Sequence, residues 1–176
     1  MLLDLGQNKN QGYILVLNKE QRLLSTRINN KLLFKLFSIT KLPLVFLTGL
    51  KVLKLNEDEC VTSVRLKYLN KNPFRSTYFA VLSMAAELST GTYALLAAAG
   101  QSPSVALIIT SMKADFIKKA TGRTTFTCTE GSKLLAAVEK TIKSKDAQPQ
   151  TVSTIGRDES GEVIAVFEFT WSFKQR

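Results

Sequence analysis

The segment between Ser76 and Met112 contains a single charged side chain, Glu87, within a long and otherwise apolar run. A helix that is apolar all round has to be covered all round by the rest of the chain. Burial disfavours the ionised form of a carboxylate and raises its pKa, so such a group is costly unless it is paired, hydrogen-bonded or used chemically. Glu87 is therefore the first candidate functional residue, and its alternative role is a hydrogen bond in a non-catalytic interface.

The apolar run predicts one long helix from about Thr77 to Ala99, loosened at Ser89–Thr92. Its length would also suffice to cross a bilayer. Glu87 and the polar residues 89–92 in its middle count against a membrane span, because polar groups are costly in hydrocarbon. We therefore expect a central helix covered by the strands that flank it.

Alternating apolar and polar residues predict antiparallel strands on both sides of this helix. The expected strands are 51–55, 60–68, 104–117, 123–129, 151–157 and 162–173, with a surface helix at 131–145 capped by Ser132. In the strand expected at 104–117, one face is predicted to hold Ala106, Ile108, Thr110, Met112, Ala114 and Phe116. Together these elements predict an α+β fold, in which a curved antiparallel sheet of five or six strands wraps around the long helix.

Residues 1–50 are expected to form an N-terminal arm and a basic amphipathic helix packed on a single domain at 51–176. The helix is predicted from Asn18 to Phe37, because Arg27, Lys31 and Lys35 recur every four residues beside a row of Ile28, Leu32 and Leu36. Its basic face either contacts solvent or docks on a membrane surface. Tyr13–Leu17 either pairs as a strand or belongs to the arm.

The chain carries a net charge of +10, and residues 1–55 hold nine Lys or Arg and two acids. Such an excess is compatible with phosphate-bearing partners: a cofactor, nucleic acid or an anionic membrane. Cys60 and Cys128 have no metal-ligand spacing and are expected to be buried thiols, with one disulfide as the alternative. No secretory signal is recognised at the N-terminus, so we expect a cytoplasmic protein.

Histidine is absent from the chain, which excludes Ser-His-Asp and Cys-His catalysis and histidine-ligated zinc. The glycine-rich motifs that cradle nucleotide phosphates are also missing. Chemistry in this chain has to rely on carboxylates, hydroxyls, amides, thiols, lysine or the backbone.

The segment Asn72-Pro-Phe-Arg-Ser-Thr-Tyr78-Phe79-Ala80, followed by Glu87, resembles hotdog-fold acyl-CoA thioesterases of the phenylacetyl-CoA thioesterase type. That family carries N-P-x-G-x-x-H-G-G, with an Asp or Glu nine residues after the His. In this chain Arg75 replaces the first Gly, Tyr78 the His, and Phe79-Ala80 the Gly-Gly. Phe116–Arg123 resembles the family's F-L-R-P-A-x-x-G strand end. With its additional N-terminal helix, the chain is similar to the branch called domain of unknown function 4442.

The chemistry of thioester hydrolysis assigns candidate roles to three residues. The N–H of Phe79 at the helix start would hold the oxyanion, because a helix N-terminus offers unsatisfied N–H groups. Glu87 would activate water or attack directly, and Asn72 would orient the water or the carboxylate. Phe79 and Glu87 lie eight residues apart, about 12 Å along a helix, so one carbonyl cannot meet both within one chain. The site is therefore expected to be shared across a homodimer, alone or within a dimer of dimers.

The resemblance also implies residues that bind the acyl group and the coenzyme A phosphates. These substrate-binding candidates are Tyr78, Ala80, Met112, Lys118, Lys119 and Arg123. The expected function is hydrolysis of a thioester of coenzyme A or an acyl carrier protein, with no metal or cofactor and no nucleic-acid partner. The alternative is a non-catalytic hotdog protein that binds acyl-CoA or fatty acid.

Overall fold

The computed structural model describes residues 17–176, and except for Leu17 the strand or arm expected at Tyr13–Leu17 lies outside the described residues. The helices in chain order are α1 (Lys19–Asn29), α2 (Lys31–Lys41), α3 (Pro43–Thr48), the short 3-10 helix η1 (Tyr68–Asn70), α4 (Phe79–Ala98) and α5 (Gly131–Ser144). The strands are β1 (Lys51–Leu55), β2 (Cys60–Arg65), β3 (Val105–Phe116), β4 (Arg123–Cys128), β5 (Gln148–Arg157) and β6 (Val163–Gln175).

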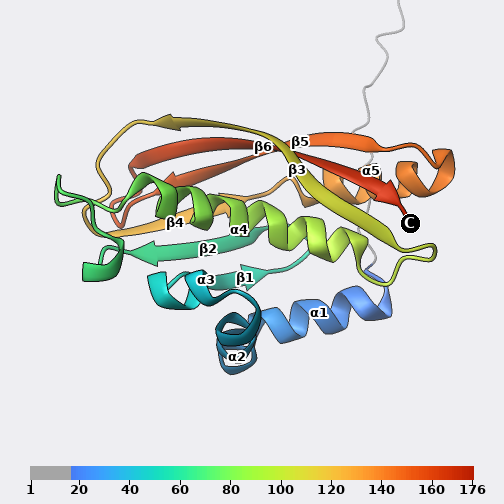
Figure 1. Ribbon diagram of the computed structural model, residues 1–176, viewed down its shortest axis with the longest axis horizontal. Helices are drawn as coiled ribbons and strands as arrows, with labels where there is room; N and C mark the ends of the chain where they lie inside the picture. The colour runs from blue at the N-terminus through green and yellow to red at the C-terminus, as the bar shows by residue number, and fades with distance from the viewer. Residues whose placement is uncertain (1–16) are drawn as a thin grey trace, which may run out of the picture.

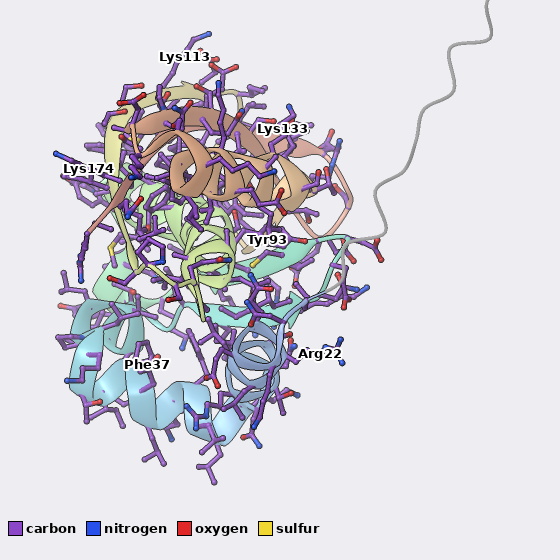
Figure 2. The ribbon with its side chains drawn as sticks, turned by 90° about the vertical axis from the view of Figure 1, so that its right-hand side faces the viewer. Arg22, Phe37, Tyr93, Lys113, Lys133 and Lys174 are labelled. Atoms are coloured by element: carbon purple, nitrogen blue, oxygen red, sulfur yellow. The ribbon has the colours of Figure 1, made fainter. Side chains whose placement is uncertain are left out.

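The six strands form one sheet in the order β1-β2-β4-β5-β6-β3, and every neighbouring pair is antiparallel. The sheet curves around α4, which lies along its inner face (Figure 1). Seen from the end of the molecule, α4 lies between the sheet layer with α5 and the blue N-terminal helices (Figure 2). The predicted α+β architecture, a curved antiparallel sheet around a long helix, is confirmed.

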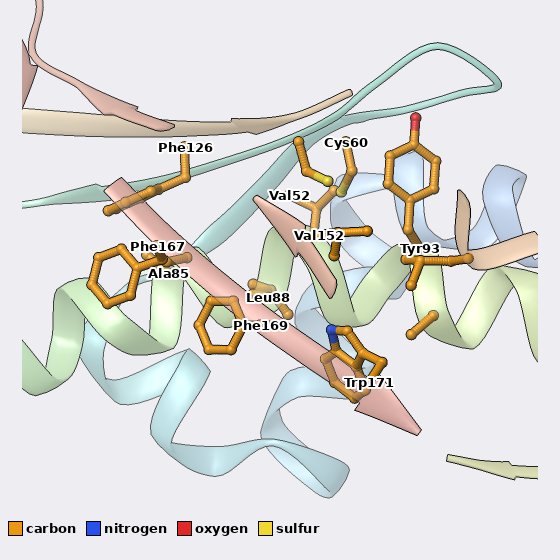
Figure 3. Close-up of a cluster of buried hydrophobic side chains, with 14 of the residues drawn as sticks. Val52, Cys60, Ala85, Leu88, Tyr93, Phe126, Val152, Phe167, Phe169 and Trp171 are labelled. Carbon is orange, nitrogen blue, oxygen red and sulfur yellow. The ribbon is translucent and has the colours of Figure 1, made fainter. Parts of the chain in front are cut away.

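The core lies between α4 and the alternating aromatic residues of β6, as Figure 3 shows. Phe167, Phe169 and Phe173 are fully buried, and Ala85 of α4 sits against this layer without exposed surface. Among the described residues, α4 is the one helix long and apolar enough to span a membrane. Yet 67% of its apolar 18-residue stretch is buried inside the molecule. The interpretation of this helix as a core element is confirmed.

The expected loosening of the central helix at Ser89–Thr92 is wrong, because α4 is continuous to Ala98. Thr90 and Thr92 donate their hydroxyls to the carbonyls of Glu87 and Leu88, three and four residues earlier. Ser89 donates to the Ala86 carbonyl and also bonds Thr154 of β5. These polar side chains are therefore satisfied inside the helix and against the sheet, and they do not interrupt it.

The face predicted for 104–117 is also wrong, because a β-bulge between Ile109 and Ser111 reverses the alternation. Before the bulge, Ile109 pairs with Trp171, whose side chain is buried. After it, Met112 pairs with Phe169. Odd-numbered residues therefore lie on the core side before the bulge and even-numbered residues after it. An extra residue in one strand shifts the side-chain period by one, and an apolar pattern on both faces conceals that shift.

The single helix expected over Asn18–Phe37 is in fact two helices that meet at Asn30, followed by α3. Asn30 has extended dihedrals, and its side chain accepts from the N–H groups of Leu32 and Leu33. An N-cap asparagine satisfies the free N–H groups in the first turn of a new helix. The four-residue spacing of basic residues from Arg27 to Lys31 therefore crosses a helix boundary.

Smaller details differ at two element ends. Helix α5 begins after Glu130, and Ser132 lies inside it rather than capping it. Strand β2 ends at Arg65 instead of reaching residue 68, because Tyr68 already begins η1. The two cysteines are buried free thiols, as expected, and the structure pairs them across β2 and β4.

Candidate active site

The site expected at the start of α4 is an open pocket of about 570 Å³. Five of the predicted residues line it: Asn72, Tyr78, Phe79, Lys118 and Lys119. The strand end after β3 reaches the helix start because the N–H of Thr77 donates to the Ala120 carbonyl at 2.8 Å. Two segments 43 positions apart in sequence, at Thr77 and Ala120, are thereby joined at one pocket.

Asn72 organises the loop before α4. Its side-chain oxygen accepts from the N–H groups of Phe74 and Ser76, and its amide group donates to the Ser76 hydroxyl. This is the turn chemistry that asparagine favours. The side chain therefore shapes the pocket wall, and any contact with substrate or water has to use its remaining hydrogen-bonding capacity.

Arg75 adopts a left-handed conformation, with φ of 60°. This position corresponds to the first glycine of the N-P-x-G pattern, and glycine adopts positive φ without steric cost. We expect Arg75→Gly to raise the free energy of unfolding by about 0.5–1 kcal/mol, since a side chain in this conformation costs about 1–2 kcal/mol and glycine loses part of that gain through its unfolded-state entropy. Chemical denaturation measures this change.

The matched control is Lys71→Gly in the same loop, where φ is −83° and glycine has no steric advantage. That variant should lose stability. Equal effects of the two substitutions would contradict the role of the positive φ.

The start of α4 presents unsatisfied backbone donors to the pocket. Phe79 is the first helical residue and Tyr78 supplies no side-chain cap. Within residues 17–176 the N–H of Phe79 has no hydrogen-bond acceptor. Thr77, which also lines the pocket, is buried and its hydroxyl has no partner among the described residues, a feature that the sequence did not single out.

Aromatic rings connect the pocket to the core. The rings of Tyr78 and Phe79 lie 4.8 Å apart, Phe79 and Phe116 6.2 Å, and Phe116 and Phe167 5.5 Å, all edge to face. Phe79 is 54% exposed and its side chain lines the pocket where the resembling motif has glycine. The pocket wall is thus apolar beside a backbone donor.

Glu87 lies two turns along α4 and does not line this pocket. Desolvation raises the pKa of its carboxyl group to about 6. In the described part of the chain its carboxylate has no hydrogen-bond or ion-pair partner. A half-buried acid with a pKa near neutrality can act as a general base under physiological conditions.

Gly91 provides the space that Glu87 occupies. A Cβ atom at Gly91 would lie 2.4 Å from Oε1 of Glu87 and 3.2 Å from the ring of Trp171. The carboxylate therefore lies over Gly91, one helical turn further on, and a Cβ atom there would displace it. The sequence signal for this role was an isolated glycine inside a helix, but it was interpreted as local loosening.

The predicted basic residues differ in their ion pairs, and two further predicted residues lie outside the pocket. Lys118 pairs with Glu162 and, at 3.8 Å, with Asp158, whereas Lys119 is exposed in the pocket wall. Arg123 opens β4 and pairs with Glu159 at 3.7 Å. Ala80 follows Phe79 on α4, and Met112 lies half-exposed on β3; neither lines the pocket.

Other chemistries find no support in the described residues 17–176. No group of three His, Cys, Asp or Glu side chains could hold a metal ion there. Burial raises the pKa of the thiols of Cys60 and Cys128, so neither is an activated nucleophile.

Comparisons with solved structures agree with this fold. A Pseudomonas aeruginosa protein of unknown function, named a probable thioesterase, aligns with a TM-score of 0.71 at 18% identity over 91% of this chain and 99% of its own. The Haemophilus influenzae thioesterase aligns with a TM-score of 0.56 at 13% identity, over 80% and 88% of the two chains. The PaaI protein of the Escherichia coli phenylacetic acid degradation operon aligns with a TM-score of 0.57 at 11% identity, over 84% and 94%.

At these identities the likeness shows the fold alone, and the fold is that of the hotdog thioesterases. No curated protein matches the sequence. The domain of unknown function DUF4442 matches residues 30–173, which is most of the chain and includes the loop, α4 and the closing strand. The chain is therefore a member of the DUF4442 family, with a hotdog fold.

Proposed function

We propose that this protein hydrolyses an acyl thioester of coenzyme A or of an acyl carrier protein, at a site formed by two copies of the chain. The observation that carries the proposal is Glu87: a half-buried carboxylate that has no partner among residues 17–176 and a pKa of about 6. A group of this kind is costly for folding and suited to proton transfer near neutral pH.

In the proposed reaction, Glu87 accepts a proton from water as the water oxygen bonds to the thioester carbonyl carbon. The carbonyl oxygen becomes negative and is held by the Phe79 N–H. Collapse of this intermediate breaks the C–S bond, and the thiolate leaves with the proton from Glu87. The products are a carboxylic acid and a free thiol, and the carboxylate of Glu87 is regenerated. Direct attack by Glu87, through an anhydride that water then opens, uses the same two groups.

The need for two copies follows from the helix itself. Phe79 and Glu87 are about 12 Å apart along α4. Phe79, Ser83 and Glu87 recur at intervals of four, so they share the face of α4 that the sheet leaves uncovered. A second α4 packed antiparallel on this face would place Glu87 of one copy near Phe79 of the other.

Strand β3 supports the same assembly. It is a 12-residue edge strand that pairs with β6 on one side only. Ile108, Met112 and Phe116 are large, apolar and about half-exposed or more along it. Long apolar edge strands invite pairing with another chain, and a second β3 would extend the sheet.

The lining of the pocket favours an acyl thioester over a more polar ester. Leu82, Phe116 and Ile117 supply apolar contacts beside the helix start. Lys119, which has no ion pair among residues 17–176, is the cation at the pocket best placed for a phosphate, since Lys118 is already paired with two carboxylates.

The rate of hydrolysis should depend on pH through the base. Because Glu87 acts only when deprotonated, kcat/KM should rise about tenfold per pH unit below about pH 6 and level off above it. The measurement is the pH profile of free-thiol release. A profile that is flat from about pH 5 to 7 would contradict a base with this pKa.

The test of the function itself is turnover of a panel of short, long and aromatic acyl-CoA thioesters by the purified protein. Free-thiol release by the protein, absent from buffer alone, supports the enzyme. No turnover on any member, with a confirmed dimer, would favour the second candidate.

That second candidate is a non-catalytic protein that binds acyl-CoA or fatty acid. The observation that favours it is the exposed Phe79 ring in the pocket wall, at a position where the family motif has glycine. A pure binder should keep its affinity for acyl-CoA when Glu87 is replaced by Gln, which titration calorimetry can measure.

A further inference from the structure

Helix α2 buries the polar Ser38 and packs Phe34 against the core, while its other large apolar side chains are exposed. Ser38 is the one residue of α2 that is buried, at 2% exposure, and its hydroxyl donates to the Phe34 carbonyl. Leu32 is 66% exposed and Leu36 54% exposed. The other large apolar residues that are exposed on α2 are Leu33, Phe37 and Ile39. A helix that simply packed on its own domain would bury this stripe.

The apolar surface continues along the next elements. Leu44 and Leu47 of α3 are exposed while Val45 between them is buried. Residues Tyr68 and Leu69 of η1, which packs against α3, are also exposed. Helix α2 lies at the lower margin of the molecule, and side chains project from it away from the sheet (Figure 2). Monomeric soluble proteins rarely expose an apolar patch of this extent without a function for it.

The charges around this patch are of one sign. From residue 21 to residue 56 the chain contains seven Lys or Arg and no Asp or Glu. Lys31, Lys35 and Lys41 are exposed on α2, and none of the three forms an ion pair with another described residue. Lysines beside exposed leucine and phenylalanine are the composition of helices that lie in a membrane interface, where long basic side chains reach the anionic headgroups.

We propose that the α2–α3 face, with its apolar residues and its fringe of lysines, docks on the surface of an anionic membrane. A second copy of the same face is disfavoured, because a two-fold contact would bring the lysines of both copies together. Nucleic acid is disfavoured by the aliphatic side chains, which offer nothing to a phosphate backbone. An anionic bilayer satisfies both parts of the surface at once.

This inference does not rest on the thioesterase activity. The face lies on helices that precede the sheet, and neither α2 nor α3 contributes a residue to the pocket at the start of α4. Variants on the face can therefore be tested for membrane binding and for turnover separately.

The experiment is co-sedimentation of the full chain with phosphatidylcholine vesicles, with and without phosphatidylglycerol, at low and high salt. We expect binding to the anionic vesicles that weakens as salt rises. Lys35→Gln with Lys41→Gln should weaken it by about 25-fold, which is about fivefold for each lysine near an anionic surface. Leu32→Gln with Leu36→Gln should weaken it at least about tenfold, because the inserted apolar area is lost.

The matched control is Lys140→Gln with Lys143→Gln on α5, which removes the same charge from an exposed helix away from the face. It should bind vesicles like the unaltered protein, and all three double variants should keep the thermal midpoint of unfolding. Absence of binding to anionic vesicles would overturn the proposal, as would equal binding with and without phosphatidylglycerol. Self-association abolished by Leu32→Gln with Leu36→Gln, without vesicle binding, would assign the face to a second copy instead.

Discussion

Glu87→Gln is expected to lower thioester turnover by about 10²–10⁴-fold, because the amide cannot accept the proton that a general base must take. Gln has nearly the same shape, so the packing against Gly91 and Trp171 should be preserved. The readout is free-thiol release at saturating acyl-CoA. Affinity for a non-hydrolysable analogue should change little.

The same substitution should stabilise the fold at neutral pH. The pKa of Glu87 is raised to about 6 in the folded chain from an ordinary value of 4.5, so ionisation favours the unfolded state. The free-energy cost of the ionised carboxylate in the folded chain is absent below pH 4.5, grows between pH 4.5 and about 6, and is constant above that. The variant should therefore gain about 1–2 kcal/mol of unfolding free energy at pH 7 and nothing at pH 4.

The control is Glu139→Gln, an exposed glutamate on α5, which should change neither turnover nor stability appreciably. Unchanged turnover in Glu87→Gln would refute the proposed base while leaving the enzyme class open. A loss of stability at pH 7 would show instead that the ionised carboxylate has a favourable partner in the assembled protein.

Phe79→Pro is expected to remove the oxyanion donor while leaving α4 in place. Proline lacks a backbone N–H and is favoured at the first position of a helix. Tyr78, which precedes it, already has φ of −61° and ψ of 136°, the conformation required before proline. Because the Phe79 N–H has no acceptor within residues 17–176, no hydrogen bond of the described chain is lost.

The comparison that isolates the donor is Phe79→Ala, which removes the ring but keeps the N–H. We expect Phe79→Pro to be slower than Phe79→Ala by about 10²–10³-fold in kcat, the effect of losing one oxyanion donor. Equal rates of the two variants would exclude this N–H from the reaction. Circular dichroism of both variants checks that the helix is intact.

A mixture of Phe79→Pro and Glu87→Gln chains tests whether the site is shared. In a mixed dimer, one of the two sites combines the intact Phe79 of one copy with the intact Glu87 of the other. Random pairing of equal amounts should therefore restore about a quarter of the unaltered activity, although each variant alone is nearly inactive. No recovery after joint refolding would place both groups in one chain or outside the mechanism.

The elements with a strong local signal were predictable from the sequence. The closing strand β6 alternates aromatic and polar residues, so its buried face could be assigned before its neighbours were known. Helix α4 was recognisable because an apolar run of that length leaves few alternatives, and Glu87 stood out within it. The motif around Asn72 and Phe79 likewise located the helix start and the pocket loop.

Features that depend on a neighbouring element were not predictable. The bulge in β3 is a matter of its register with β6, and residues 105–109 before it are apolar on both faces, so alternation alone could not reveal it. The role of Gly91 depends on Glu87 Oε1 and Trp171 meeting at one place, which no local pattern records. An asparagine such as Asn30 can lie inside a helix or cap the start of one, and the sequence does not distinguish the two. The break between α1 and α2 was therefore missed.

Hydrophobic periodicity indicates that one face of an element is apolar. Only the tertiary packing decides whether the rest of the chain covers that face. The apolar faces of β6 and α4 cover each other in the core, and the sequence interpretation was correct. For α2 most of the same kind of stripe is exposed, because Phe34 and Ser38 take the inward positions and the helix starts anew at the Asn30 cap. Burial is a property of two surfaces in contact, and a sequence describes each surface separately.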